Sequence, residues 1–217
     1  MTSVEYLGKY QLTQSDACFK LGRDSVLLAG FCTLRPKWTV CDLGCGVGSL
    51  LLLTAQREEN LTRVGIELDP TAAELARKNL ADNALSGTIL TGDLREKSLL
   101  RGDQFHLVLS NPPYFRAGSG RSGGQARMDD TCSVLDLCRT AGRLTRTGGR
   151  FALAYRPERL AELFAALQKA RLEPKRMQLL SYHRTKAPYA VLVEAVKEGG
   201  PGLDILPTHY QTEDRLT

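Results

Sequence analysis

The amino-acid sequence predicts an α/β fold, a doubly wound and mostly parallel seven-stranded sheet with a C-terminal antiparallel hairpin. From Trp38 onward, short β-branched or apolar runs alternate with longer segments of helical period, which is the pattern of successive βαβ units. Near the C-terminus, two apolar runs are separated only by residues 182–188. That connection is too short for a crossover helix, so it predicts a hairpin.

The predicted strands and helices follow one another without an internal repeat. Strands are expected at residues 39–42, 63–67, 87–91, 105–110, 150–155, 175–181 and 190–196. Helices are expected at residues 49–59, 70–83, 130–144 and 157–170. The start of the second helix has local support, because Asp69 is a good cap residue and Pro70 suits the first helical position. Before Trp38, residues 25–32 are expected to form a helix packed on the sheet.

Length and composition suit one globular domain. The chain has 217 residues, of which 42% are hydrophobic, enough for a proper core. We divide it into an N-terminal extension (1–37), a main domain (38–198) and a C-terminal tail (199–217). No apolar stretch approaches the roughly 18 to 20 residues of a membrane span, so we expect a cytoplasmic protein. The formal net charge of +5 is compatible with a polyanionic partner without requiring one.

The six cysteines could in principle pair with one another or hold a metal. None forms a Cys-x-x-Cys motif, and most have apolar neighbours. Reduced, mostly buried thiols are therefore expected, with no metal site.

A glycine-rich turn, Asp42-Leu43-Gly44-Cys45-Gly46-Val47-Gly48, follows the first predicted strand. Its glycines permit positive φ and close approach of a cofactor to the backbone. Glu67 ends the next strand, about 20 residues on, where a carboxylate can accept hydrogen bonds from ribose hydroxyls. Glycines after a strand are often only a turn, and a lone terminal glutamate is often solvated. Their order along successive strands favours a nucleoside site.

The spacing of the glycines indicates which kind of nucleoside cofactor the turn binds. Dinucleotides normally call for Gly-x-Gly-x-x-Gly, whereas here the spacing is Gly-x-Gly-x-Gly with Asp42 in front. An acid there repels phosphate but suits the ammonium group of S-adenosylmethionine. After the third strand, Asp93 could accept from the adenine amine, with Leu68 and Leu94 covering the ring faces. The run resembles the class I S-adenosylmethionine-dependent methyltransferases, which implies a Rossmann-like methyltransferase fold over 38–198.

The fourth strand delivers Asn111-Pro112-Pro113-Tyr114 to the same sheet edge. Methylating a planar nitrogen requires its delocalised lone pair to be freed, which an enzyme promotes by accepting the amine's hydrogens. The Asn111 side-chain oxygen and the Pro112 carbonyl can be those acceptors. The prolines fix the geometry, and Tyr114 offers a face for stacking. The structural alternative is a proline-rich strand exit with a partly buried tyrosine.

Such a motif is typical of methyltransferases that act on adenine, on ribosomal RNA guanine or on a glutamine amide, and it does not choose among them. The N-terminal segment does. Gln14, Phe19-Lys20 and Asp24-Ser25-Val26-Leu27-Leu28 resemble the pattern that precedes the cofactor turn in the bacterial tRNA(Val) adenine-N6 methyltransferase family. The resemblance implies methylation of the adenine just 3′ of the anticodon, with tRNA as partner.

The resemblance and the motifs together give the expected site. Catalytic roles are expected for Asn111, Pro112 and Tyr114. Contacts with S-adenosylmethionine are expected from Lys20, Asp24, Asp42, Gly44, Gly46, Gly48, Glu67, Leu68, Asp93, Leu94 and Asn111. Substrate contacts are expected from Phe115, Arg116 and Arg127, with further basic residues on the hairpin turn. Ordinary solubilising charge explains these basic residues about equally well.

Three other functions remain open from the sequence. One is a methyltransferase acting on ribosomal RNA guanine N2 or a protein glutamine amide, which usually brings a separate recognition domain. A second is a dinucleotide-dependent oxidoreductase, which Asp42 and the glycine spacing disfavour. The third is a cofactor-binding RNA module without catalysis.

Overall fold

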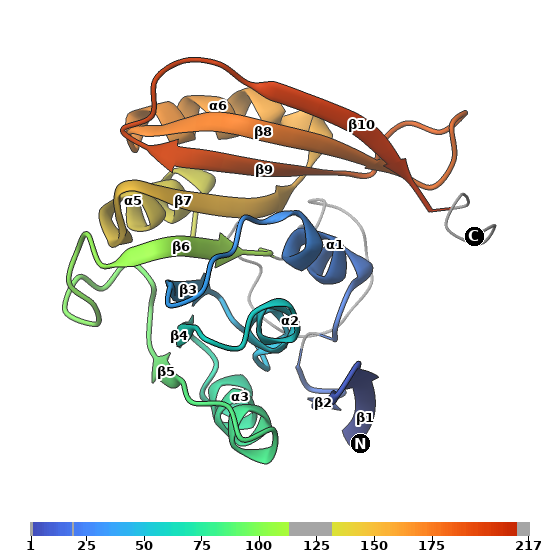
Figure 1. The fold of residues 1–217 in the computed structure, drawn as a ribbon, viewed down its shortest axis with the longest axis vertical. Helices are drawn as coiled ribbons and strands as arrows, with labels where there is room; N and C mark the ends of the chain where they lie inside the picture. The colour runs from blue at the N-terminus through green and yellow to red at the C-terminus, as the bar shows by residue number, and fades with distance from the viewer. Residues whose placement is uncertain (1, 19, 113–131, 212–217) are drawn as a thin grey trace.

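The centre of the protein is an eight-stranded sheet (Figure 1). The computed structural model describes residues 2–18, 20–112 and 132–211. The strand order is β10-β8-β9-β7-β6-β3-β4-β5. The strands span Thr39–Leu43 (β3), Thr62–Glu67 (β4), Thr88–Thr91 (β5), Phe105–Ser110 (β6), Thr145–Tyr155 (β7), Leu172–Ser181 (β8), Ala190–Lys197 (β9) and Asp204–Tyr210 (β10). Strand β9 is antiparallel to both β7 and β8, and the other pairs are parallel. The predicted fold class and antiparallel hairpin are confirmed.

Helices cover both faces of the sheet, as a doubly wound fold requires. They span Arg23–Phe31 (α1), Ser49–Arg57 (α2), Pro70–Asp82 (α3), Val134–Leu144 (α5) and Leu160–Lys169 (α6), the last preceded by a 3-10 turn at Pro157–Arg159. Leucines and alanines of α1, α2 and α3 share one core with one face of the sheet. The buried residues of α5 and α6 form a second core on the other face. Among the described residues, no helix is both long and apolar enough to cross a bilayer.

The eighth strand corrects the predicted count of seven. Strand β10 lies in the segment expected to be a tail, and it pairs with β8 at the edge of the sheet. Pro207 interrupts it, and the register of the pairing shifts between Leu206 and His209. Proline cannot donate a hydrogen bond to a neighbouring strand and is confined to edges and bulges. The sequence does not predict this strand, because Pro207 within it argues against a strand.

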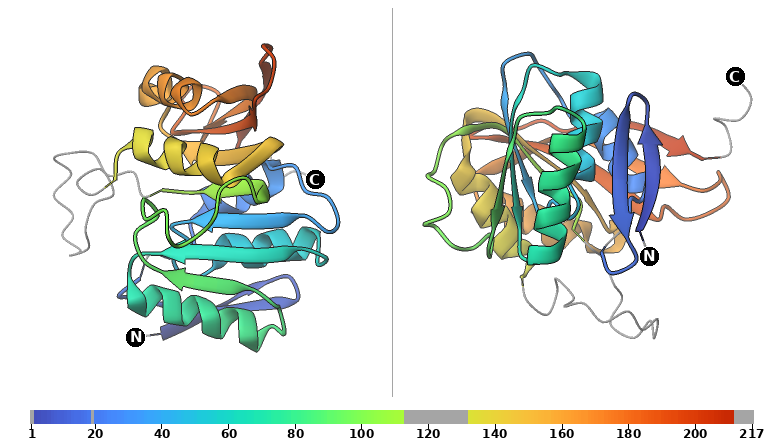
Figure 2. Two further views of the ribbon diagram at one scale, coloured as in Figure 1. Left: turned by 90° about the vertical axis from the view of Figure 1, so that its left-hand side faces the viewer. Right: turned by 90° about the horizontal axis from the view of Figure 1, so that it is seen from below.

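The N-terminal extension contains a hairpin that the sequence analysis did not predict. Strands β1 (Thr2–Leu7) and β2 (Tyr10–Ser15) pair with each other outside the main sheet, and Figure 2 shows them beside α3. Asn79 of α3 holds β2 in place, since its side chain accepts from Thr13 N (2.9 Å) and donates to Thr13 O (2.9 Å). Gly8, with φ +57°, forms the short turn between two alternating runs, a signal that could have revealed the hairpin.

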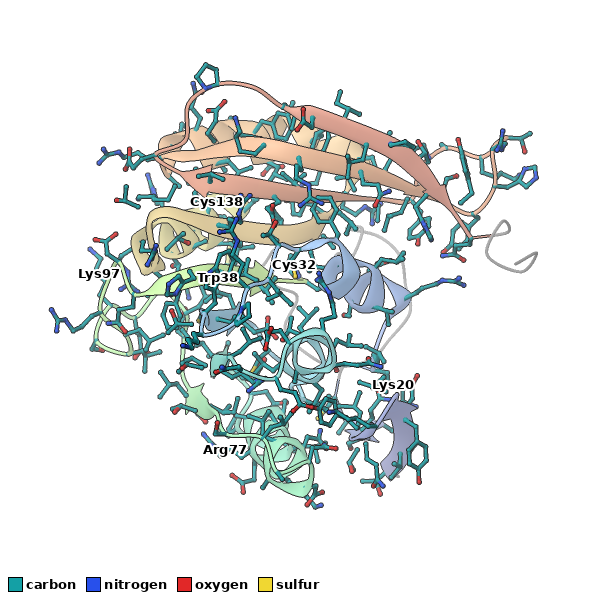
Figure 3. The ribbon with its side chains drawn as sticks, in the orientation of Figure 1. Lys20, Cys32, Trp38, Arg77, Lys97 and Cys138 are labelled. Atoms are coloured by element: carbon teal, nitrogen blue, oxygen red, sulfur yellow. The ribbon has the colours of Figure 1, made fainter. Side chains whose placement is uncertain are left out.

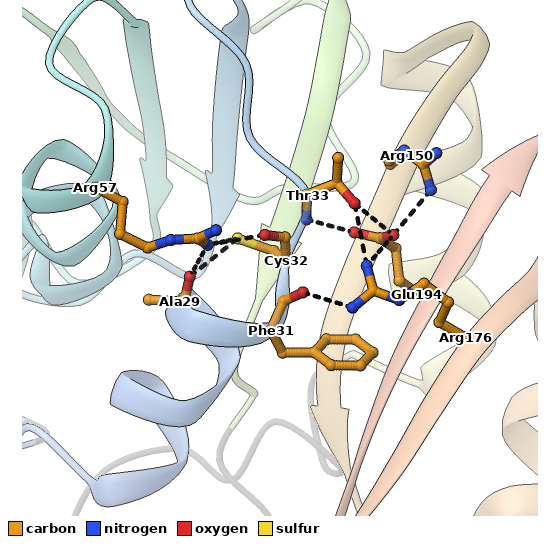
Figure 4. A network of polar contacts seen from close by, with 8 residues as sticks. All are labelled: Ala29, Phe31, Cys32, Thr33, Arg57, Arg150, Arg176 and Glu194. Carbon is orange, nitrogen blue, oxygen red and sulfur yellow. Dashed lines mark hydrogen bonds and ion pairs between the residues drawn. The ribbon is translucent and has the colours of Figure 1, made fainter. Parts of the chain in front are cut away.

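A buried charged network anchors the segment after α1 to the sheet (Figure 4). Glu194 of β9 is fully buried, and its carboxylate accepts from Arg150 (2.8 Å) and Arg176 (3.2 Å). It also accepts from the backbone N–H of Thr33 (2.7 Å) and from the Thr33 hydroxyl (2.9 Å). Arg176 further donates to the carbonyl of Phe31 (3.2 Å), the last residue of α1. These contacts fix the position of α1 on the sheet.

Candidate active site

Four parallel strands end at one edge of the sheet, and the predicted cofactor and motif residues follow them. The glycine turn follows β3, Glu67 ends β4, Asp93 comes shortly after β5 and Asn111 directly follows β6. Ligands of open α/β sheets bind at this carboxyl edge. The topology thus brings these four parts of the chain, which are far apart in the sequence, to the same edge of the sheet.

The glycine turn has a backbone conformation that suits glycine. Gly44, Gly46 and Gly48 have φ values of +72°, +53° and +85°, which side-chain-bearing residues adopt only with strain. A Cβ atom built on Gly44 or Gly46 would meet no atom of the described chain within 4 Å. The N–H groups of Gly44 and Cys45 both donate to the carbonyl of Ile66 (2.9 and 3.0 Å), which holds the turn against β4. The turn therefore presents exposed backbone at which a ligand can lie.

Two carboxyl groups lie next to this turn: Asp42 near the end of β3 and Glu67 at the end of β4. Asp42 is buried, and within the described residues its Oδ1 atom has no hydrogen-bond partner. Burial raises the pKa of Asp42 to about 8, and the nearby charge of Glu67 adds to the shift. Glu67 accepts hydrogen bonds from Gly46 N (2.7 Å) and Asp69 N (2.9 Å). A buried carboxyl with an unsatisfied oxygen fits a cationic ligand, which would stabilise its ionised form.

We expect S-adenosylmethionine to bind more weakly as pH falls from 7.5 to 6. Below pH 8 the Asp42 carboxyl of the free protein is mostly protonated, so binding a cation beside it must release a proton, and affinity drops as pH drops. Over this range the cofactor's ammonium stays mostly protonated, and the dissociation constant should rise roughly tenfold or more. Isothermal titration calorimetry measures it. Asp42→Asn should bind weakly with little pH dependence, and an equally flat wild-type profile would exclude this role for Asp42.

The residues expected around the adenine ring differ in how accessible they are. Leu68 is 55% exposed, whereas Leu94 is only 7% exposed and packs in the core with residues of α5. Leu94 thus has little surface to offer a ring. Asp93 accepts hydrogen bonds from the backbone and side chain of Arg95, and this contact lowers the pKa of Asp93. The sequence analysis missed the ion pair between these residues, although they are only two positions apart.

Asn111 is oriented by a residue of α1 that the sequence analysis left without a role. Its Nδ2 atom donates to the hydroxyl of Ser25 (2.9 Å), which is buried in the first turn of α1. This contact turns the amide nitrogen toward α1 and defines the side-chain oxygen as the acceptor. Ser110 donates to the carbonyl of Leu43 (2.9 Å) and ties the end of β6 to β3. Pro112 is buried.

Lys20 and Asp24 have protein partners in the structure. Lys20, labelled in Figure 3, pairs with Asp16 (2.7 Å) and is more than half exposed. Asp24 is hydrogen-bonded to Tyr189, and burial raises the pKa of its carboxyl, with that hydrogen bond acting in the opposite direction. Several predicted residues lie outside the described residues: Phe19, Pro113, Tyr114, Phe115, Arg116 and Arg127.

The fold, the glycine turn beside Asp42 and Glu67, and Asn111 at the same edge define a class I S-adenosylmethionine-dependent methyltransferase. The family model described as "Methyltransferase small domain" matches residues 20–169. The chain belongs to this family.

Named relatives agree with this assignment. The chain is 32% identical over 205 residues to the tRNA1(Val) (adenine(37)-N6)-methyltransferase of Porphyromonas gingivalis, covering 89% of this chain and 80% of that protein. A protein of the same name from Dickeya chrysanthemi is 35% identical over 159 residues, covering 70% and 62% of the two chains.

Solved structures share the fold. A crystal structure of a predicted O-methyltransferase from Agrobacterium tumefaciens matches with a TM-score of 0.72 and 26% identity, covering 86% of each chain. Geranyl diphosphate C-methyltransferase from Streptomyces coelicolor, solved with S-adenosyl-L-homocysteine, matches with a TM-score of 0.59 and 13% identity. The match covers 80% of this chain and 78% of that one, and at this identity it concerns the fold alone.

Proposed function

We propose that the chain transfers a methyl group from S-adenosylmethionine to the exocyclic N6 amine of an adenine in tRNA, at the position just 3′ of the anticodon. The observation that carries the chemistry is the placement of Asn111. It follows β6, directly beside the glycine turn of β3, and Ser25 holds its amide nitrogen (2.9 Å). The choice of tRNA adenine is supported by the names of relatives that cover most of the chain.

The proposed role of the chain is to position the amine and free its lone pair. S-adenosylmethionine supplies a methyl group on a positively charged sulfur. The Asn111 side-chain oxygen and the Pro112 carbonyl accept hydrogen bonds from the two amine hydrogens. The lone pair of the nitrogen is then less delocalised into the ring and is available to attack the methyl carbon. As the nitrogen bonds to the methyl carbon, the bond between that carbon and sulfur breaks and S-adenosylhomocysteine leaves. The nitrogen becomes positively charged and then loses one proton to water or a neighbouring oxygen. Tyr114 stacks on the base.

The remaining residues are assigned to binding. Asp42 faces the cofactor's ammonium group, and Glu67 keeps acceptor capacity for ribose hydroxyls beside its two backbone contacts. Leu68, exposed at the same edge, covers one face of the adenine ring. Phe115, Arg116 and Arg127 contact the tRNA, and the catalytic domain consists of residues 38–198 together with β10, which belongs to the same sheet.

A direct test incubates the purified protein with S-adenosylmethionine and an unmodified tRNA(Val) transcript. Nucleoside mass spectrometry of the digested tRNA should then find close to one N6-methyladenosine per molecule. A reaction without protein controls for chemical methylation. Absence of N6-methyladenosine from protein that demonstrably binds the cofactor would refute the proposal. Methylated guanosine would instead support the ribosomal RNA type of acceptor.

A further inference from the structure

The turn between β8 and β9, residues 182–189, lies at the same edge of the sheet as Asn111. Strand β8 runs in the same direction as β6, because β9 is antiparallel to both β8 and β7 while β7 is parallel to β6. Strand β10 is parallel to β8 and ends at this edge (Figure 1). Gln211 directly follows β10 and therefore lies at this edge as well. Three strand spacings separate β8 from β6, which is about 14 Å. The turn is close enough to serve the same substrate.

Two tyrosines of this turn form a stack with an anchored inner ring. The rings of Tyr182 and Tyr189 have centroids 4.4 Å apart and an interplanar angle of 26°. The Tyr189 hydroxyl accepts from the side-chain amide of Gln211 (2.8 Å) and is also hydrogen-bonded to Asp24. The inner ring is thus held from both α1 and the end of β10. Tyr182, the outer ring, is 55% exposed.

The turn that carries the stack also carries basic side chains. Arg184 lies over the ring of Tyr210 (5.5 Å to the centroid), and His183 and Lys186 are exposed on the same turn. The turn itself contains no acidic residue. Asp24, the acid beside the stack, is engaged with Tyr189. Exposed aromatic rings among positive charges are the usual surface for unpaired bases of RNA, since rings stack on bases and cations contact phosphates.

Helix α1 connects this stack to the motif. Asp24 contacts Tyr189, and the next residue, Ser25, contacts Asn111. We propose that Tyr182, backed by Tyr189, is a stacking platform for an unpaired RNA base next to the target nucleotide. The inference rests on the proposed function, because it names the surface by which the same site holds its RNA. Arg184 and Lys186 contact the phosphates on either side of that base.

The test measures RNA affinity without relying on methyl transfer. Full-length protein saturated with S-adenosylhomocysteine is titrated against a fluorescent, unmodified tRNA(Val) anticodon stem-loop, and anisotropy gives the dissociation constant. Tyr182→Ala should weaken binding roughly five- to 100-fold, as expected for one lost base stack. Tyr182→Phe should bind like the wild type, because it keeps the ring. Tyr6→Ala is the matched control, since Tyr6 is 71% exposed on β1 and should leave affinity unchanged.

The outcomes distinguish this platform from the proposed function. Equal affinities of wild type and Tyr182→Ala, or no binding by the wild type, would overturn the platform. If N6-methyladenosine forms nonetheless, the proposed function stands. Conversely, Tyr182-dependent binding without methylated adenine would support the platform and refute the reaction. Thermal unfolding of each variant checks that it is folded. If Tyr182→Ala is destabilised, the double variant Arg184→Ala/Lys186→Ala takes its place. It should reduce the salt dependence of RNA binding, because two phosphate contacts are lost.

Discussion

Replacing Asn111 with alanine should reduce the rate constant of methyl transfer by roughly 10²- to 10³-fold, the usual cost of losing one preorganised group at a reacting centre. The side chain removed is the proposed acceptor of an amine hydrogen, and its orientation is set by Ser25 at 2.9 Å. The affinity for S-adenosylmethionine should change far less, because Asp42, Glu67 and the glycine turn remain. Single-turnover kinetics with saturating cofactor and tRNA measures the transfer step directly.

Asn60→Ala supplies the matched control, since Asn60 is exposed on the loop between α2 and β4. It should transfer the methyl group at the wild-type rate. Asn111→Asp keeps the shape and an acceptor oxygen, so we expect it to retain more activity than Asn111→Ala. If Asn111→Ala transfers as fast as wild type, Asn111 has no role in catalysis. The chain would then catalyse the transfer through other residues.

Replacing Glu194 with alanine should lower the free energy of unfolding by about 3 kcal/mol. The substitution leaves two arginines and the Thr33 N–H without the carboxylate that they share, and breaking a buried ion pair typically costs 3–5 kcal/mol. The lower end applies here, because the side chains of Arg150 and Arg176 are 27% and 31% exposed and can be rehydrated. Urea denaturation followed by circular dichroism measures the change.

Glu162→Ala is the comparison for Glu194→Ala. Glu162 pairs with Arg159 on the surface of α6, and both side chains are more than a third exposed, so its loss should cost roughly 0–1 kcal/mol. A cost for Glu194→Ala no larger than this would show that the network in Figure 4 does not hold α1 on the sheet. A destabilised α1 would also disturb Ser25, so residual methyl transfer by Glu194→Ala should fall with its stability.

The central strands and their functional edge were predictable because each depends on local signals. A buried strand such as β6 is a continuous apolar run, and the turn after β3 needs glycines at positive φ. Strand β10 was missed because Pro207 argues against a strand unless its edge position is known. Local sequence patterns thus predicted the edge of the sheet that binds the cofactor, but they did not predict the outermost strand, β10.

Contacts between distant segments could not be inferred from one sequence. Ser25 and Asn111 are 86 positions apart, and Thr33 and Glu194 are 161 apart. Neither pair has a spacing or motif that links its members, and only the packing of α1 brings them together. For the same reason the sequence shows basic residues on the hairpin turn but does not place them next to a tyrosine stack.

The proposed acceptor of the methyl group is one adenine next to the anticodon. The most direct measurement compares transfer of labelled methyl from S-adenosylmethionine to two tRNA(Val) transcripts that differ only at that adenine, which is guanine in the second. We expect about one methyl group per molecule on the first transcript and none on the second. Equal labelling of both transcripts would contradict the proposed target.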